Sequence, residues 1–127
     1  MIQATELRLG NYVNLNDGSE HDKIRQISGI EHKIVYTLIK GCRFAQVHQS
    51  FDRIYPIPLT EEIIIKCGFE RSEYNDYRHP ILFGTLTLYE GVAELHISDM
   101  YSVWVNNLHQ LQNLYFALTG EELEVKI

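Results

Sequence analysis

The sequence predicts an α+β fold in which a small SH3-like or OB-like β-barrel is followed by a short helix, an antiparallel β-meander and a C-terminal helix. Residues 1–58 contain short apolar segments separated by turn residues, whereas residues 59–127 contain two helical patterns and three alternating ones. The chain has 127 residues, of which 45% are hydrophobic, enough for one sizeable core. We therefore expect a single domain with a barrel-like part, 1–58, and a part built of helix, sheet and helix, 59–127.

Five short strands predict the barrel. They cover residues 7–15, 23–30, 33–39, 43–49 and 51–57. Each is rich in β-branched residues or alternates apolar with polar ones, as short strands of a half-buried sheet do. Gly29 predicts that the second strand coils or bulges, and Pro56 and Pro58 end the fifth because proline lacks a ladder donor.

The second part begins with a short helix that Thr60 opens and Gly68 closes. A hairpin turn is expected at residues 75–76, and three strands follow. They cover residues 81–89, 92–98 and 101–105. Their alternation predicts one apolar face, against which the C-terminal helix packs. This face contains Leu82, Leu86, Leu88, Ala93, Leu95 and Ile97.

The segment from Asn107 to Gly120 predicts a helix whose two ends are both marked. Asn107 is a preferred N-cap, Gln110 stands at the capping-box position, and Gly120 tolerates the left-handed conformation that ends a helix. We expect a helix over residues 108–118, with a core-facing stripe about 120° wide. The stripe contains Leu108, Leu111, Leu114, Tyr115 and Leu118.

Charge and cysteine content narrow the classes of function. The net charge of −6 argues against broad binding of phosphate backbones, and residues 56–127 carry four Lys or Arg against eleven Asp or Glu. Cys42 and Cys67 form no Cys-x-x-Cys motif, which is typical of reduced thiols in a cytosolic protein. No apolar run approaches the ~20 residues of a membrane span. We expect a cytoplasmic protein without a membrane segment.

The candidate catalytic residues are few. Six histidines are scattered along the chain without the spacing of zinc ligands. Glu94 and His96 project from the same face of one strand beside Ser98, as an acid–base pair would. Period-two alternation also places polar residues on the solvent face of any such strand, and the sequence contains no phosphate loop, nucleophile elbow or carboxylate dyad. We expect no catalytic residue, no metal site and no cofactor.

Two surfaces remain as candidate binding sites. On the last helix, Phe116 lies away from the apolar stripe, on a polar face that it shares with three neighbours: His109, Gln112 and Asn113. The C-terminal tail, a second copy of the chain or a foreign protein are the alternative partners of this aromatic ring. The barrel is the alternative site, for RNA or single-stranded DNA, because it interleaves basic and aromatic residues. These residues are Lys23, Arg25, Tyr36, Lys40 and Arg43.

Three stretches of the chain resemble a known group of proteins. They are residues 7–13 (Leu-Arg-Leu-Gly-Asn-Tyr-Val), residues 56–69 (Pro-Ile-Pro-Leu-Thr-Glu-Glu, continuing to Lys-Cys-Gly-Phe) and residues 109–123 (His-Gln-Leu-Gln-Asn-Leu-Tyr-Phe-Ala-Leu-Thr-Gly-Glu-Glu-Leu). The group comprises uncharacterised small proteins of phages and prophages in gut anaerobic bacteria. The resemblance covers nearly the whole length but is looser between the three stretches. It departs at residues 106–108, where the group is more apolar.

The resemblance implies an accessory protein made in an infected bacterial cytoplasm, and it supplies no catalytic residue. Together with the aromatic ring on the last helix, it leads us to expect a non-enzymatic module that binds a host or phage protein. A homodimer is a further possibility, and nucleic acid is the less favoured partner.

Overall fold

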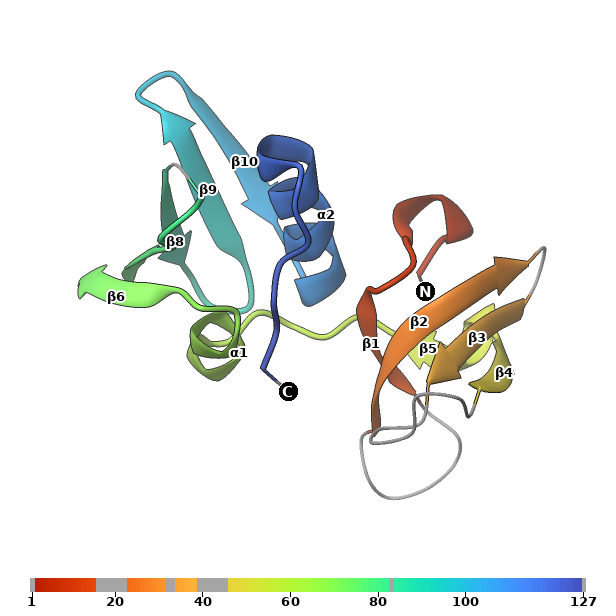
Figure 1. The fold of residues 1–127 in the computed structure, drawn as a ribbon. Helices are drawn as coiled ribbons and strands as arrows, with labels where there is room; N and C mark the ends of the chain where they lie inside the picture. The colour runs from red at the N-terminus through yellow and green to blue at the C-terminus, as the bar shows by residue number, and fades with distance from the viewer. Residues whose placement is uncertain (1, 16–22, 32–33, 39–45, 83, 127) are drawn as a thin grey trace. The chain divides into compact units, whose positions relative to one another are not determined.

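The computed structural model describes residues 2–15, 23–31, 34–38, 46–82 and 84–126 (Figure 1). These residues form two five-stranded antiparallel sheets and two α-helices, which confirms the α+β class. The chain divides into two compact units, Met1–Ile57 and Pro58–Ile127. Each unit has its own sheet.

The first unit is a sheet with the strand order β4-β3-β2-β1-β5. Its elements are the 3-10 turns η1 (Ala4–Glu6) and η2 (Phe51–Arg53) and the strands β1 (Tyr12–Leu15), β2 (Lys23–Glu31), β3 (Ile34–Leu38), β4 (Gln46–Ser50) and β5 (Ile54–Tyr55). The described pairings leave β4 and β5 at the two edges, and no pairing among these residues joins the edges. An SH3-like or OB-like closed barrel is therefore not confirmed.

The first and fifth strands of this unit are less than half as long as the sequence predicts. The first begins at Tyr12 rather than at residue 7, because the amide of Arg8 donates to Oδ1 of Asn11 at 2.6 Å and holds residues 8–11 in a turn. The fifth has two residues because η2 occupies the first half of the predicted segment. The bulge predicted at Gly29 is confirmed, since the β2–β3 register shifts between Ile27 and Gly29.

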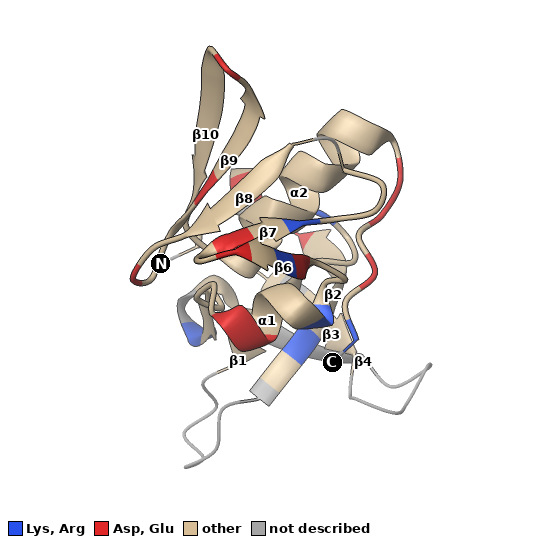
Figure 2. Cartoon of the chain, turned by 90° about the vertical axis from the view of Figure 1, so that its left-hand side faces the viewer, with Lys and Arg blue, Asp and Glu red and all other residues tan. Residues whose placement is uncertain are grey.

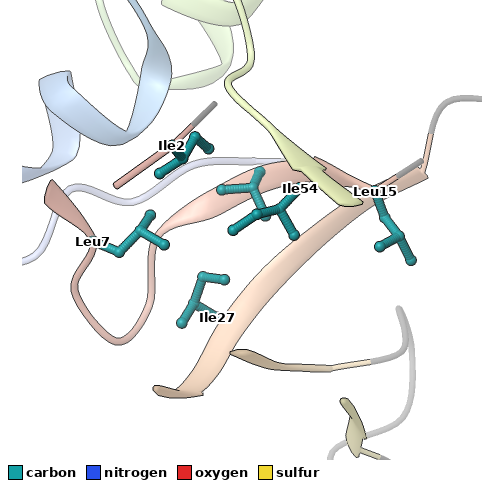
Figure 3. Packing of buried hydrophobic residues seen from close by; sticks show 6 residues of the cluster. Ile2, Leu7, Leu15, Ile27 and Ile54 are labelled. Carbon is teal, nitrogen blue, oxygen red and sulfur yellow. The ribbon is translucent and has the colours of Figure 1, made fainter. Parts of the chain in front are cut away.

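The core of the first unit lies on one face of the sheet. Figure 3 shows the side chains that gather there from the N-terminal segment, β1, β2 and β5. They are Ile2, Leu7, Val13, Leu15, Ile27 and Ile54. Burying each such aliphatic side chain contributes about 1.5–3 kcal/mol relative to leaving it exposed. The turn at residues 8–11 stabilises this core indirectly, because it directs Leu7 back onto the sheet.

The second unit is a sheet with the strand order β10-β9-β8-β7-β6, and Figure 1 shows helix α2 lying along it. Its elements are α1 (Glu61–Lys66), β6 (Glu70–Glu73), β7 (Asp76–Arg78), β8 (Thr85–Leu88), β9 (Ala93–Ser98), β10 (Tyr101–Val105) and α2 (Leu108–Thr119). Within the residues that the structure describes, no helix combines the length and apolar character that a membrane crossing requires.

The predicted ends of both helices are confirmed. The Thr60 side chain accepts from the amide of Ile63, and the Asn107 side chain accepts from the amide of Gln110 at 3.1 Å. Helix α2 ends at Thr119, one residue later than expected, and its C-cap is the predicted Gly120, which has a φ of 76°. Gln110 completes the start of the helix by accepting from the amide of Asn106, next to the cap, at 2.9 Å.

The buried face of α2 differs from the predicted stripe. Leu108, Leu111 and Tyr115 are buried as expected. Leu118 is 44% exposed, because the last turn lines an open pocket with Ile81 and Ile97. His109 and Gln112 are buried instead, so the buried arc is rotated by about 80° around the helix axis from the predicted one.

A structured loop replaces the first half of the strand predicted over residues 81–89. Nδ1 of His79 accepts from the amides of Ile81 and Leu82, at 3.1 and 3.4 Å. The ring also donates to the backbone carbonyl of Cys67, which defines the Nε2–H tautomer. Gly84 closes the loop at a φ of 118°, where an added Cβ would lie 2.5 Å from the backbone oxygen of His96. The backbone groups of residues 81 and 82 are therefore committed to His79 and not to a strand.

We predict that the second unit loses stability below about pH 6.5 because of His79. Burial lowers the pKa of this ring below its ordinary value of 6.5, and the bond to Cys67 opposes this only in part. The native state therefore holds the neutral ring while the unfolded state binds a proton. The stabilisation is complete above pH 6.5 and is lost as the pH falls through the window between 6.5 and the lowered native pKa.

Urea unfolding between pH 5 and pH 7.5 measures this dependence. His79→Gln should flatten it in that window, whereas His96→Gln serves as the control for removing a histidine from the same sheet. A wild-type free energy of unfolding that is constant over the window would contradict the role of His79.

Candidate functional site

The outer face of the second sheet, opposite α2, carries aligned polar and aromatic side chains. Trp104 of β10 lies opposite Glu94 of β9, and Glu94 lies opposite Thr87 of β8. In the neighbouring row, His96 of β9 lies between Ser102 and Thr85. Directly opposite residues of an antiparallel sheet project to the same face. The two rows therefore form one surface that alternates with the buried Leu86, Ala93 and Leu95.

The carboxylate of Glu94 is the centre of this surface. Its Oε2 accepts from the Ser102 hydroxyl at 2.7 Å, and its Oε1 accepts from the Tyr89 hydroxyl at 3.3 Å. Nε2 of His96 lies 3.3 Å from the same Oε1. The Glu94 side chain is only 15% exposed, so these partners hold a carboxylate that is largely screened from water. A carboxylate offers about four acceptor positions, and these three partners leave room for one more donor.

Two aromatic rings stand beside this carboxylate. The ring centroids of Tyr89 and Trp104 are 5.5 Å apart with an interplanar angle of 43°. The two residues remain 45% and 57% exposed. Partial loss of hydration, followed by the charge of Glu94, raises the pKa of Tyr89, so this hydroxyl keeps its proton and donates to Glu94. We call Tyr89, Glu94, His96, Ser102 and Trp104 the Glu94 cluster.

A cavity of about 780 Å³ adjoins the Glu94 cluster and shares His96 with it. It lies between the outer face of β7–β9 and the loop that His79 holds in place. Its polar lining includes Asp76, Arg78, Thr85, Thr87, His96 and Ser98. The hydroxyl of Thr87 donates to Oδ1 of Asp76 at 2.8 Å, which fixes two of these groups. The cavity extends the outer surface of the sheet beyond the cluster.

The Glu94–His96 pair confirms that the two side chains share a face, but its surroundings differ from those of the acid–base pair considered as an alternative. Ser98 does not join the pair, because its hydroxyl accepts from the amide of Met100. Ser102 occupies that position, and its hydroxyl donates to the carboxylate and not to the imidazole. A hydroxyl bonded to a carboxylate is not the nucleophile–base arrangement of a Ser–His pair. The geometry suits charge recognition better than nucleophilic chemistry.

Two of the four residues of the predicted binding site on α2 are buried. His109 and Gln112 are 0% and 2% exposed, so the prediction that they form an exposed polar face with Phe116 is wrong. Phe116 is 41% exposed, and Asn113 is half-buried. All four side chains belong to residues that already make a polar, ionic or ring interaction. Binding of a partner at Phe116 stays a prediction. The exposed polar face that suggested it is not formed, because His109 and Gln112 are buried.

The residues of the predicted nucleic-acid surface are only partly described. Lys40 and Arg43 lie outside the described residues, and Lys23 begins β2. Arg25 shares a face of the sheet with Ile27, whereas Tyr36 projects to the other face, since its neighbour Thr37 lies opposite Ile27. The carboxylate of Glu31 next to Tyr36 raises the pKa of its hydroxyl. The structure thus does not bring Arg25 and Tyr36 together.

Comparison with protein-family models, with curated proteins and with solved structures finds no match for this chain. Among the described residues, no three His, Cys, Asp or Glu side chains are grouped as metal ligands would be. The geometry of the Glu94 cluster is therefore the basis on which a function can be inferred. Sequence reasoning singled out Glu94 and His96 but missed Tyr89, Ser102 and Trp104.

A double-mutant cycle on Glu94 and Ser102 tests the centre of the cluster. We expect Glu94→Gln to lower the free energy of unfolding by about 1 kcal/mol, because it weakens a charge-assisted hydrogen bond at a partly exposed site. Ser102→Ala should couple with it by roughly 0.5–1 kcal/mol in urea unfolding. Ser98→Ala is the control and should show no coupling with Glu94→Gln. Equal coupling of both serines would contradict the observed hydrogen bonding.

Proposed function

We propose that this protein is a non-enzymatic protein-binding module whose Glu94 cluster binds a Lys- or Arg-bearing segment of another protein. The observation that carries the proposal is the exposed ring pair of Tyr89 and Trp104 beside the screened carboxylate of Glu94. Aromatic faces and a carboxylate both attract a cation, and their contributions combine where water is partly excluded. Trp and Tyr are also the residues in which the binding energy of protein interfaces concentrates.

The charge of the surrounding surface supports a basic partner. Residues 56–127 carry a net charge of −7, with four basic and eleven acidic side chains. Figure 2 shows acidic residues on α1, on the strands of the second unit and along the segment after α2. This distribution steers a basic segment toward the second unit and disfavours a phosphate backbone. A host or phage protein remains the expected partner, and the cytoplasm of an infected bacterium the expected location.

The alternative, single-stranded nucleic acid bound by a barrel in the first unit, stays a prediction. The interleaving of basic and aromatic residues in residues 1–55 supports it, although the six acidic residues of this segment nearly cancel the seven basic ones. The separation of Arg25 and Tyr36 onto opposite faces does not, because base stacking and phosphate contacts need to follow one groove. Steep loss of affinity with added salt would distinguish this partner from a protein segment.

Titration with defined peptides tests the proposal, using Trp104 as the reporter because it is the only tryptophan of the chain. Three peptides of about twelve residues are compared: Lys and Thr alternating, Glu and Thr alternating, and Ser and Thr alternating. We expect the basic peptide to change the fluorescence of Trp104 and to bind at least about tenfold tighter than the neutral one, equivalent to about 1.4 kcal/mol. The acidic peptide should give no response.

Two variants with the same change in net charge provide the matched control. Glu94→Gln should weaken the basic peptide about tenfold, because it removes the carboxylate beside the rings. Glu73→Gln removes an exposed acid from β6, at the opposite edge of the same sheet, and should leave the affinity within about twofold. Equal losses of peptide affinity in the two variants would show that net charge alone causes the effect, and would overturn the proposed site. Binding of a thymidine oligonucleotide that neither variant changes would favour the first unit instead.

A further inference from the structure

The two edges of the second sheet are built differently. Strand β6, at one edge, consists of Glu70, Arg71, Ser72 and Glu73, so charged side chains protect it from pairing with another strand. Strand β10, at the other edge, contains neither a charged residue nor a proline, and Figure 2 shows it free of acidic and basic colour along its length. Four of its five residues are exposed. This edge lacks the devices that normally prevent strand addition.

The hydrogen bonds of the meander show which backbone groups of β10 point outward. The amide of Tyr89 donates to the carbonyl of Val92 at 2.8 Å, so the pairing of β8 with β9 begins with a hydrogen-bonded pair at that turn. Hydrogen-bonded and non-hydrogen-bonded pairs then alternate, which directs the backbone of Ala93 and Leu95 toward β10. Their partners, Val105 and Val103, point back to β9.

The N–H and C=O groups of Ser102 and Trp104 consequently point away from the sheet. Two other bonds agree with this alternation. The amide of Leu88 points to β7, where it donates to the carbonyl of Asn75 at 2.8 Å. The amide of Asn106, two residues beyond Trp104, is on the outward side, where Gln110 accepts it. Among the described residues, no backbone hydrogen bond outside the sheet ladders involves Ser102 or Trp104.

We propose that β10 pairs antiparallel with β10 of a second copy of this chain, with the two-fold axis at Val103. In this register, Ser102 of each copy lies opposite Trp104 of the other. Both residues have outward-pointing backbone groups, so each of these two pairs exchanges both of its N–H···O bonds. The outer surfaces of the two sheets become continuous, and the two Glu94 clusters come to lie on one face.

The side chains are self-complementary in this register. Val103 is 39% exposed and meets Val103 of the second copy on the inner face, at a pair whose Cα atoms are about 4.5 Å apart. Tyr101, which is 71% exposed, lies opposite Val105 of the second copy. Aromatic and β-branched cross-strand pairs are favourable, and no like charges stand directly opposite each other because β10 carries none. A shift of the pairing by one residue would place side chains of opposite faces together.

The surface area buried in the contact limits the affinity of the dimer. A single pair of five-residue strands buries less than the roughly 1,200–2,000 Å² of a stable interface. The association is therefore weak and reversible, with a dissociation constant of about 10 μM to 1 mM. This inference does not depend on the basic segment proposed above, because it uses the backbone of Ser102 and Trp104 and the inner-face side chain of Val103, whereas the Glu94 cluster is made of side chains on the outer face.

Disulfide trapping tests the register directly. Val103→Cys, introduced together with Cys42→Ser, places its thiols at a pair about 4.5 Å apart in Cα distance, within the range of about 4.4–6.8 Å that disulfides span. Cys67 does not interfere, because it is buried and burial raises its pKa to about 12. The control is Ser102→Cys, whose thiols would be diagonal to each other and about 7–8 Å apart. We expect the first variant to form a covalent dimer at least about tenfold faster.

Charge reversal at the same position tests the association without a covalent bond. Val103→Lys and Val103→Glu should each sediment as monomers, because each places like charges directly opposite one another. An equimolar mixture of the two should regain the dimer, which shows that both variants are folded. Their binding of the basic peptide, reported by Trp104, should remain within about twofold of wild type if the Glu94 cluster is intact.

The outcomes separate the two proposals. A wild-type protein that is monomeric at 1 mM, equal trapping of the two cysteine variants, or a mixture that stays monomeric would each overturn the β10 dimer. None of these results bears on the basic peptide. Conversely, if Glu94→Gln weakens peptide binding but still dimerises, this result bears only on the proposed function.

Discussion

The register between β9 and β10 decides which side chains of the second unit face the solvent. A regular two-residue turn at Asp99 and Met100 would place Trp104 opposite Leu95, on the buried side of the sheet. The observed pairing instead skips Ile97 between the partners of Tyr101 and Ser102, so Trp104 lies opposite Glu94. One additional residue in β9 therefore exchanges the two faces of β10. The ring pair, the carboxylate cluster and the exposure of Val103 all depend on that bulge.

The Glu94 carboxylate shows how a strand surface can hold a charge without a deep pocket. Its partners come from three places, the residue after β8, the same strand and the next strand. Removing one partner therefore leaves two, and the side chain keeps its place on the sheet. A carboxylate that is fixed in this way loses little conformational freedom when a cation approaches, whereas a flexible surface glutamate loses more. The arrangement favours recognition through preorganisation.

Much of the fold follows from local signals in the sequence. Asn107, Thr60 and Gly120 define helix ends because capping is a local interaction of a few residues. The limits of β10 were also predicted correctly, since its alternation is uninterrupted. The long-range features were not predictable in this way. His79 replaces a predicted strand with a loop by bonding two amides, and the bulge at Ile97 leaves no signature in composition or periodicity. The residues of the candidate site depend on these long-range features.

Gln110 has a second role besides its position in the first turn of α2. By accepting the amide of Asn106, it removes the next outward donor beyond Trp104 and so ends the available edge. Growth by successive strand addition needs a free, extendable edge at every step. In the proposed dimer, the contact between identical edges uses up the uncharged side of both second-unit sheets, and the charged β6 strands form the outer edges of the joined sheet. Such a dimer would be a closed, two-fold assembly, in which strand addition at this sheet would stop after one contact.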